Sequence, residues 1–215
     1  MHEDLKNFEK YLHLENEFPP LVRLAITHYQ FEAIHPFSDG NGRIGRLLNV
    51  LLMVHWNLLP LPLLYLSPFF EGHRQEYYDL LLNFSKSGRW REWIIFFLRG
   101  VLEQTKEATN EIKRLQDLQS EWRHRFTEFN LGPSALKRID KLFDFPIISI
   151  RDVKKHLNIS YPSAKRVVGK FIDAKILIQI GDSSYAKLFI AKDFFKDVKD
   201  WDDLVFRIKL LEAKH

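Results

Sequence analysis

Apolar residues recur at intervals of three or four between residues 3 and 129, which is the spacing of one face of an α-helix. Leu5, Phe8 and Leu12, for example, share a face of the first segment. Two consecutive prolines, at positions 19 and 20, mark the start of a second helix, because proline is tolerated in a first helical turn. The segment 43–56 is apolar nearly all round, which is typical of a helix at the centre of a bundle. The predicted helices are residues 3–14, 20–34, 43–56, 67–84 and 89–129, the last with a bend near Gly100.

The pattern changes after residue 130. A break rich in Gly, Pro and Ser is followed by shorter helical segments and then by two apolar, β-branched runs that are typical of strands. The break is 131–134, the helices are 134–143, 149–157 and 161–174, and the strands are 176–180 and 185–190, separated by a turn at 181–184. The chain is therefore predicted to be mainly α, with a helical bundle followed by a small α+β domain.

The sequence His35-Pro-Phe-Ser-Asp-Gly-Asn-Gly-Arg-Ile-Gly-Arg46 separates the second and third predicted helices. It gathers a histidine, an acid, three glycines and two arginines into twelve positions. Glycine and asparagine tolerate left-handed backbone, so the run from Gly40 to Gly42 can turn successive amides toward one point and bind an anion. The following helix would direct the positive end of its dipole at the same point. This stretch therefore indicates an anion-binding site.

The charged residues of this stretch point to a polyphosphate. Arg43 and Arg46 are three apart, hence on one helix face, where guanidinium groups can bind phosphate oxygens in pairs. Asp39 would repel a phosphate unless a cation lies between them, and Mg²⁺ commonly bridges a carboxylate to phosphates. His35 adds a titratable base at the edge of the site. Taken one by one, these residues also fit ordinary roles, namely a helix-ending histidine, a turn with an N-cap, and a solvated first helical turn.

The same residues match, at every defined position, the Fic-domain motif His-Pro-Phe-x-(Asp/Glu)-Gly-Asn-Gly-Arg-x-x-Arg, and the flanks resemble family members over roughly the first half of the chain. The resemblance implies an enzyme, a protein adenylyltransferase that moves AMP from ATP to a Ser, Thr or Tyr hydroxyl of a target protein, or of itself, with release of pyrophosphate. It implies His35 as general base, Asp39 as the ligand of Mg²⁺ and Phe37 as a buried anchor of the loop. It implies nucleotide-binding roles for Gly40, Asn41, Gly42, Arg43, Gly45 and Arg46.

Two further features of the first half bear on this resemblance. Tyr77 and Tyr78 lie on the predicted helix 67–84 and are candidates for the adenine pocket, although aromatic residues at helical spacing are more often core. Glu71 lies in a Ser-x-x-x-Glu-Gly sequence that resembles the family's autoinhibitory motif in an unusual place, and we interpret it as compensation of a helix dipole. His28 has no His or Cys neighbour and is predicted to be a packed helix residue.

The composition is that of an ordinary globular protein, with 46% hydrophobic residues and a formal net charge of +4. The absence of cysteine excludes disulfides and thiolate sites, and fits a reducing compartment. No leader opens the chain and no apolar run is long enough to span a bilayer, so the sequence predicts a cytoplasmic protein that does not bind membranes.

The positive charge is concentrated in the second half, where residues 131–215 carry 17 Lys and Arg against 11 Asp and Glu. The order of helices and strands there resembles a winged helix-turn-helix with residues 161–174 as the recognition helix. Lys165, Arg166 and Lys170 would then contact DNA phosphates, although winged helices also serve as protein contacts. Three domains are predicted: a Fic core (1–98), a helical connector (99–130) and the winged helix (131–215). The connector either packs on its own chain or forms a homodimer contact.

Fic enzymes of this type also carry an upstream β-hairpin flap that docks the target, and the sequence has no room for it. We therefore expect a core without a flap, from a fragment or a truncated gene product. Two hypotheses stand beside the enzyme: a nucleotide-sensing, DNA-binding regulator, and a catalytically silent truncated Fic fragment. The histidine at position 35 favours the enzyme, since a sensor needs the anion site but no base.

Overall fold

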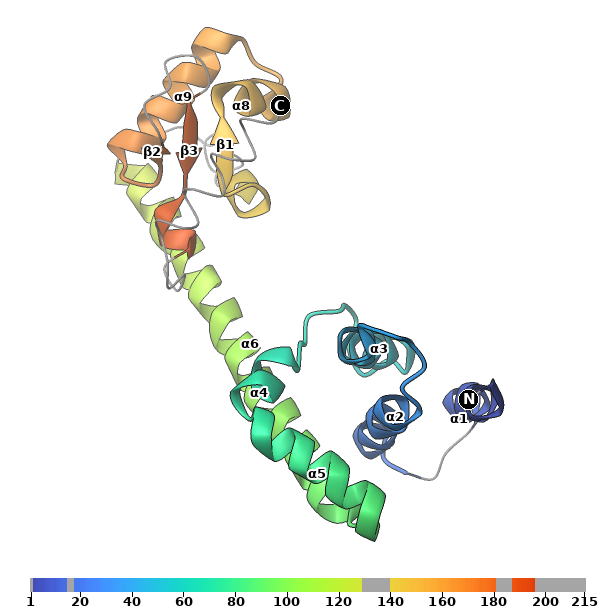
Figure 1. Cartoon of the computed structure of the whole chain (residues 1–215). Coiled ribbons are helices and arrows are strands. Elements are labelled where there is room, and N and C mark those ends of the chain that lie inside the picture. Colours follow the sequence, from blue (N-terminus) through green and yellow to red (C-terminus); the bar gives the residue numbers. More distant parts are fainter. Residues whose placement is uncertain (1, 15–17, 129–139, 181–186, 196–215) are drawn as a thin grey trace. The chain divides into compact units, whose positions relative to one another are not determined.

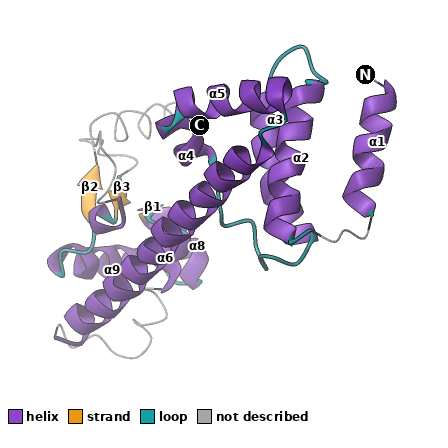
Figure 2. Cartoon of the chain, turned by 90° about the horizontal axis from the view of Figure 1, so that it is seen from below, coloured by secondary structure: helices purple, strands orange, loops and turns teal. Residues whose placement is uncertain are grey.

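The computed structural model describes residues 2–14, 18–128, 140–180 and 187–195 (Figure 1). It divides into two compact units, Met1–Glu111 and Ile112–His215. The boundary lies within helix α6 (Trp90–Glu128), in the segment predicted to be a connector. Most described residues are helical and the three strands belong to the second unit, which confirms the predicted fold class (Figure 2). None of the helices described here combines the length and the hydropathy needed to cross a bilayer.

The first unit is built from helices whose boundaries follow local signals. Helix α2 has Pro20 at its first position, and α3 begins directly after Gly40, whose φ of 83° lies in the left-handed region. The other helices of this unit also follow the predicted order. The helices are α1 (His2–His13), α2 (Pro20–Ile34), α3 (Asn41–His55), α4 (Ser67–Gly72), α5 (Arg74–Ser87) and the first part of α6.

One predicted helix, 67–84, is two helices in the structure. The break is at His73, whose φ of −118° and ψ of 36° are not helical. Its backbone N–H and its ring Nδ1 both lie 3.0 Å from the carbonyl oxygen of Phe69, which closes α4. Ser67 is the first residue of α4, and no side-chain bond caps this helix. Helix α5 then runs on to Ser87 and ends at a left-handed Gly88.

The core of the first unit forms between α2, α3, α4, α5 and α6. Trp93 and Phe97 of α6 are fully buried, and the Trp93 indole donates to the carbonyl of Ala25 at 2.8 Å. Helix α6 continues through Gly100, where a Cβ atom would lie only 2.5 Å from Cδ1 of Phe69. Gly100 is therefore required for the close packing of α6 against Phe69 of α4. The sequence pattern had predicted only a bend at this position.

The second unit has a three-stranded antiparallel sheet in the order β1-β3-β2. Ile190 of the central strand pairs with Ile147 on one side and with Ile178 on the other, and it is fully buried. Strand β1 was not predicted, and the predicted turn 181–184 lies outside the described residues, as does most of the predicted helix 134–143. The elements are β1 (Ile147–Ser149), α8 (Ile150–Leu157), α9 (Tyr161–Asp173), β2 (Ile178–Ile180), β3 (Leu188–Ile190) and η1 (Lys192–Phe195).

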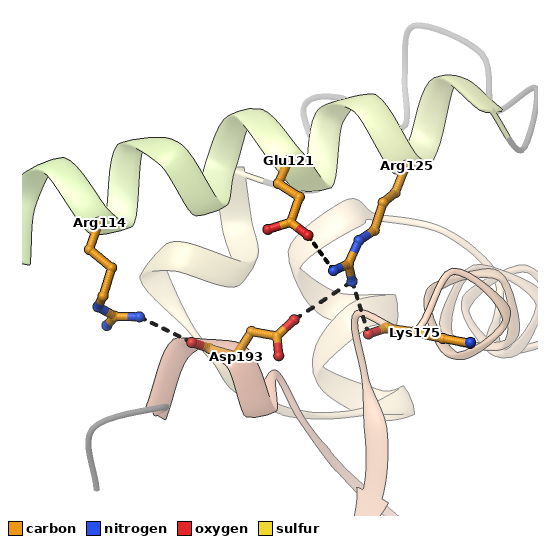
Figure 3. Close-up of polar contacts among 5 residues, drawn as sticks. All are labelled: Arg114, Glu121, Arg125, Lys175 and Asp193. Carbon is orange, nitrogen blue, oxygen red and sulfur yellow. Dashed lines mark hydrogen bonds and ion pairs between the residues drawn. The ribbon is translucent and has the colours of Figure 1, made fainter.

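The last part of α6 is built into the second unit. Leu118 and Trp122 are buried in its core, and the Trp122 ring lies 5.0 Å from that of Phe143. Polar contacts add to this packing: Arg125 contacts Glu121 on its own helix and also Asp193 of η1 (Figure 3). The prediction that this stretch packs on its own chain is therefore confirmed for Leu118 and Trp122.

Candidate active site

The histidine of the motif stands at the end of α2. His35 is exposed, caps the helix in a left-handed conformation with φ 48° and ψ 58°, and donates its backbone N–H to Phe31 at 3.1 Å. A residue before proline is forced out of the right-handed helical region, so Pro36 explains why α2 ends here. A positive φ is uncommon for a residue with a side chain, and such strain often marks functional sites.

The loop after His35 is held by Asn41. Its Oδ1 accepts the backbone N–H of Phe37 at 2.9 Å, and its Nδ2 donates to the carbonyl of the same residue at 2.6 Å. Asn41 is only 2% exposed, whereas Phe37 is 46% exposed. The prediction of Phe37 as a buried anchor is therefore wrong. The buried amide of Asn41 fastens the loop instead, because it satisfies both backbone groups of one loop residue.

The start of α3 carries the groups that are predicted to bind an anion. Gly40 precedes it in the left-handed conformation and gives no side-chain cap bond. The first amides of a helix have no partner within the helix and can bind an anion. Arg43 is exposed and its Nη2 lies 3.3 Å from Oδ2 of Asp39, while Oδ1 of Asp39 accepts the Gly40 N–H at 2.6 Å. Arg46 is half-buried, and its Nη1 would lie 3.2 Å from a Cβ atom at Gly42. Gly42 thus leaves room for the Arg46 guanidinium.

Asp39 is compatible with a magnesium ion. The part of the chain that the structure describes holds no group of three side chains that could bind a metal by themselves. Mg²⁺ needs no such group at a phosphate site, since it commonly takes one or two carboxylates, water and phosphate oxygens. The Asp39 side chain is 91% exposed and carries hard oxygen donors beside Arg43, one of the predicted phosphate-binding residues. It could hold a magnesium ion bound to a nucleotide.

A buried polar network lies behind these residues. Nε2 of His28 is 3.0 Å from the hydroxyl of Tyr77, and Nδ1 is 3.0 Å from Nδ2 of Asn49. Burial lowers the pKa of His28 to about 3, so its ring is neutral near pH 7 and packs among aromatic rings. The prediction that His28 is a packed helix residue is confirmed.

The two candidate adenine-pocket tyrosines lie in different environments. Tyr77 is buried, and burial followed by the charge of Glu32 raises the pKa of its hydroxyl. Tyr78 is 53% exposed, with the guanidinium of Arg74 5.8 Å from its ring centre. Tyr77 therefore has a place in the core as well as a predicted nucleotide role, which stays a prediction for both residues.

Sequence reasoning missed Glu32, which lies one turn before His35 on α2. Its carboxyl group is half-buried against α3, where a Cβ atom at Gly45 would lie 2.6 Å from Oε1. Burial raises the pKa of this carboxyl, although the charges of Arg46 and His35 act in the opposite direction. The available signal was that Glu32 is the one acidic residue of α2 and lies three positions before the motif.

The candidate nucleic-acid residues lie apart in sequence, on α9 of the second unit. Lys165, Arg166 and Lys170 are all exposed, and Arg166 donates to the Ser163 hydroxyl at 3.4 Å. The hydroxyl of Ser160 accepts the Ser163 N–H and so caps the start of this helix. Their role in DNA binding stays a prediction.

Comparison with known proteins finds similarity to proteins of one family. Residues 1–53 match the model of the Fic/DOC family. The chain is 38% identical over 114 residues to a protein adenylyltransferase Fic of Culex quinquefasciatus, which is 50% of this chain and 21% of that protein. It is 42% identical over 60 residues to the protein adenylyltransferase fic-1 of Caenorhabditis elegans, which is 27% of this chain and 12% of that protein.

The chain thus matches about a fifth or less of the length of these relatives. Among solved structures, a crystal structure of a Fic family protein from Desulfovibrio desulfuricans G20 aligns with 88% of this chain and 54% of that one, at 22% identity and a TM-score of 0.48. The family match includes the whole segment from His35 to Arg46, whose loop, left-handed glycine and arginines are described above. Residues 1–53 of this chain are therefore similar to the Fic/DOC family.

Proposed function

We propose that this chain is a protein adenylyltransferase, which transfers AMP from ATP to a hydroxyl side chain of a target protein. The observation that carries the proposal is the placement of His35, a base at the end of α2, beside the first turn of α3 with its amides and two arginines. The relatives named above are protein adenylyltransferases, which supports the same activity here.

In this proposal, the hydroxyl oxygen of the target attacks the α-phosphorus of ATP and a new oxygen–phosphorus bond forms. The bond from the α-phosphorus to the oxygen that bridges to the β-phosphorus breaks, and pyrophosphate leaves with that electron pair. His35 takes the hydroxyl proton, because a neutral hydroxyl is a poor nucleophile. The α3 amides, Arg43 and Arg46 bind the phosphates and stabilise the negative charge.

Asp39 would hold magnesium on the phosphates. A bound Mg²⁺ supplies charge neutralisation and polarises the phosphoryl oxygens. The remaining predicted residues, Gly40, Asn41, Gly42 and Gly45, keep the backbone of the loop and the first helical turn open to the phosphates. Asn41 contributes in addition by fixing the loop through Phe37.

The test is the intact mass of the purified chain after incubation with magnesium and ATP, because such an enzyme can modify itself. We expect a gain of one AMP in the wild type and none in His35→Ala, while calorimetry shows that this variant still binds ATP. His55→Ala changes another exposed histidine, at the end of α3, and should leave the gain intact. A gain that survives in His35→Ala would show that the base is another group.

A second function, DNA binding, is favoured by one observation on α9. Between Tyr161 and Ile172 this helix exposes Lys165, Arg166 and Lys170 and carries no acidic residue. As a proposed winged helix, the unit would place these cations against phosphates. Fluorescence anisotropy with a labelled duplex should show binding that weakens with salt and weakens further in Lys165→Gln/Lys170→Gln. Equal binding by this variant and the wild type would exclude α9 as the contact.

A further inference from the structure

One carboxyl oxygen of Glu32, Oε1, is a buried acceptor without a hydrogen bond among the described residues. This atom has essentially no exposed surface. Most buried polar atoms in proteins are paired, because leaving one unpaired costs about 1–3 kcal/mol. An unpaired carboxylate oxygen next to a ligand site therefore calls for a functional explanation.

Glycines of α3 make room for this carboxyl group. A Cβ atom at Gly45 would lie 2.6 Å from Oε1 of Glu32, too close for any side chain to fit without displacing the acid. A Cβ atom at Gly42 would lie 4.0 Å from the same oxygen and 3.2 Å from Nη1 of Arg46. The carboxyl group of Glu32, from α2, and the guanidinium group of Arg46, from α3, thus both lie close to Gly42.

We propose that Glu32 is a positioning residue for Arg46: in the nucleotide-bound site its carboxylate accepts one N–H of the guanidinium while other N–H groups bind phosphate. This inference rests on the proposed function, since it assigns Arg46 to the nucleotide. An arginine has five N–H donors in a rigid planar fork and can bind two anions at once. The burial of Oε1 turns this oxygen away from a ligand, so we assign Glu32 a role through Arg46.

The charges around Glu32 support this pairing. Three titratable groups influence or are influenced by it: His35 at the end of the same helix, Arg46 on α3 and Tyr77 on α5. Burial raises the pKa of the Glu32 carboxyl, and the charge of Arg46 opposes this shift more strongly than the charge of His35 does. The attraction to Arg46 therefore already operates without a ligand.

The opposite effect is also conceivable, because a carboxylate near a phosphate site repels the ligand. The two effects predict different signs for Glu32→Gln, which keeps the shape of the side chain and removes its charge. If positioning dominates, this variant should bind MgATP about tenfold more weakly, the loss expected for one charge-assisted hydrogen bond. If repulsion dominates, it should bind as well as the wild type or more tightly, and the proposal is then wrong.

Calorimetric titration with MgATP in a double-mutant cycle tests whether Glu32 acts through Arg46. In an Arg46→Ala background, Glu32→Gln should cause no additional loss of affinity. In an Arg43→Ala background it should cause the full tenfold loss, since Arg43 is paired with Asp39 and provides a matched control. An equal loss in both backgrounds would mean a general structural effect and would overturn the proposal.

Glu32→Asp keeps the charge on a shorter side chain and should recover part of the affinity lost in Glu32→Gln. If the Asp variant binds no better than the Gln variant, charge is not the cause and the proposal fails. Binding is measured directly, so the result does not depend on transfer activity. A wild-type chain that binds no MgATP would instead refute the proposed function, and this inference with it.

Discussion

Oδ2 of Asp39 lies 3.3 Å from Nη2 of Arg43, one helical turn further along the motif, and the two side chains are 91% and 75% exposed. Such exposed pairs contribute only about 0–1 kcal/mol to stability, so the acid is not retained for folding. We predict that Asp39→Asn unfolds at the wild-type temperature but loses the increase of ATP affinity with Mg²⁺. ATP titrations with and without magnesium measure this. A variant whose affinity still rises with magnesium as in the wild type would exclude Asp39 as the ligand.

Gly100 is predicted to be intolerant of substitution. An added Cβ atom would lie 2.5 Å from Cδ1 and 2.8 Å from Cε1 of Phe69, inside the core of the first unit. Overpacking of this kind costs about 1–3 kcal/mol, so Gly100→Ala should lower the free energy of unfolding by that amount in urea titrations.

Gly72 provides the matched control for Gly100. It lies in α4 of the same unit and a Cβ atom there would meet nothing within 4 Å. Gly72→Ala should therefore be neutral or stabilise by up to about 1 kcal/mol, because alanine has the higher helix propensity. Equal destabilisation by the two substitutions would contradict the packing argument.

His28 should make the first unit sensitive to acid. Burial lowers its pKa from 6.5 to about 3, so the folded chain disfavours the protonated ring while the unfolded chain accepts a proton below pH 6.5. The contribution of the neutral His28 ring to the free energy of unfolding is therefore fully present above pH 6.5. This contribution is lost as the pH falls toward 3, by at most about 1.4 kcal/mol per pH unit.

Urea titrations at pH 7.5, 6.5 and 5.5 measure this dependence on pH. The wild type should lose stability across the series, and His28→Gln should lose less, whatever its stability at pH 7.5. The comparison uses the slopes, since the substitution also changes the bonds to Tyr77 and Asn49. Parallel slopes would mean that another group takes up the proton.

Trp122 should be essential to the second unit. It is fully buried, and its Nε1 has no hydrogen-bond partner among the described residues. Trp122→Ala should cost about 3–5 kcal/mol of the free energy of unfolding, because a large buried ring is removed. Trp122→Phe should cost clearly less, since it keeps an aromatic ring and removes the unpaired N–H. Similar costs for both would indicate that this indole is not packed as described.

The sequence predicted the elements that depend on local signals. Pro20 and Pro36 determine the limits of α2, and the glycine at position 40 determines the start of α3. The loop 35–40 therefore lies between two helices as predicted, whereas the rest of the motif, from Asn41, is already part of α3. Which side chains are buried depends instead on packing between elements. Phe37 is apolar and was expected to be buried, but Asn41 satisfies the loop backbone and Phe37 stays exposed.

Other features depended on partners that are distant in sequence. Strand β1 has only three residues and becomes a strand because Ile147 pairs with Ile190. The break at His73 and the need for Gly100 both involve Phe69. The role of the Glu32 carboxyl depends on its approach to Gly45, which no spacing along a single helix reveals.

Helix α6 provides residues to both hydrophobic cores, Trp93 and Phe97 to the first and Leu118 and Trp122 to the second. The two units are thus not modules separated by a spacer, and recombination between genes could not exchange the second unit at residue 131 without removing two of its core residues. A productive crossover would have to fall within the codons for α6 near the boundary at Glu111. Relatives that share the second unit should therefore also share the sequence of the last part of α6.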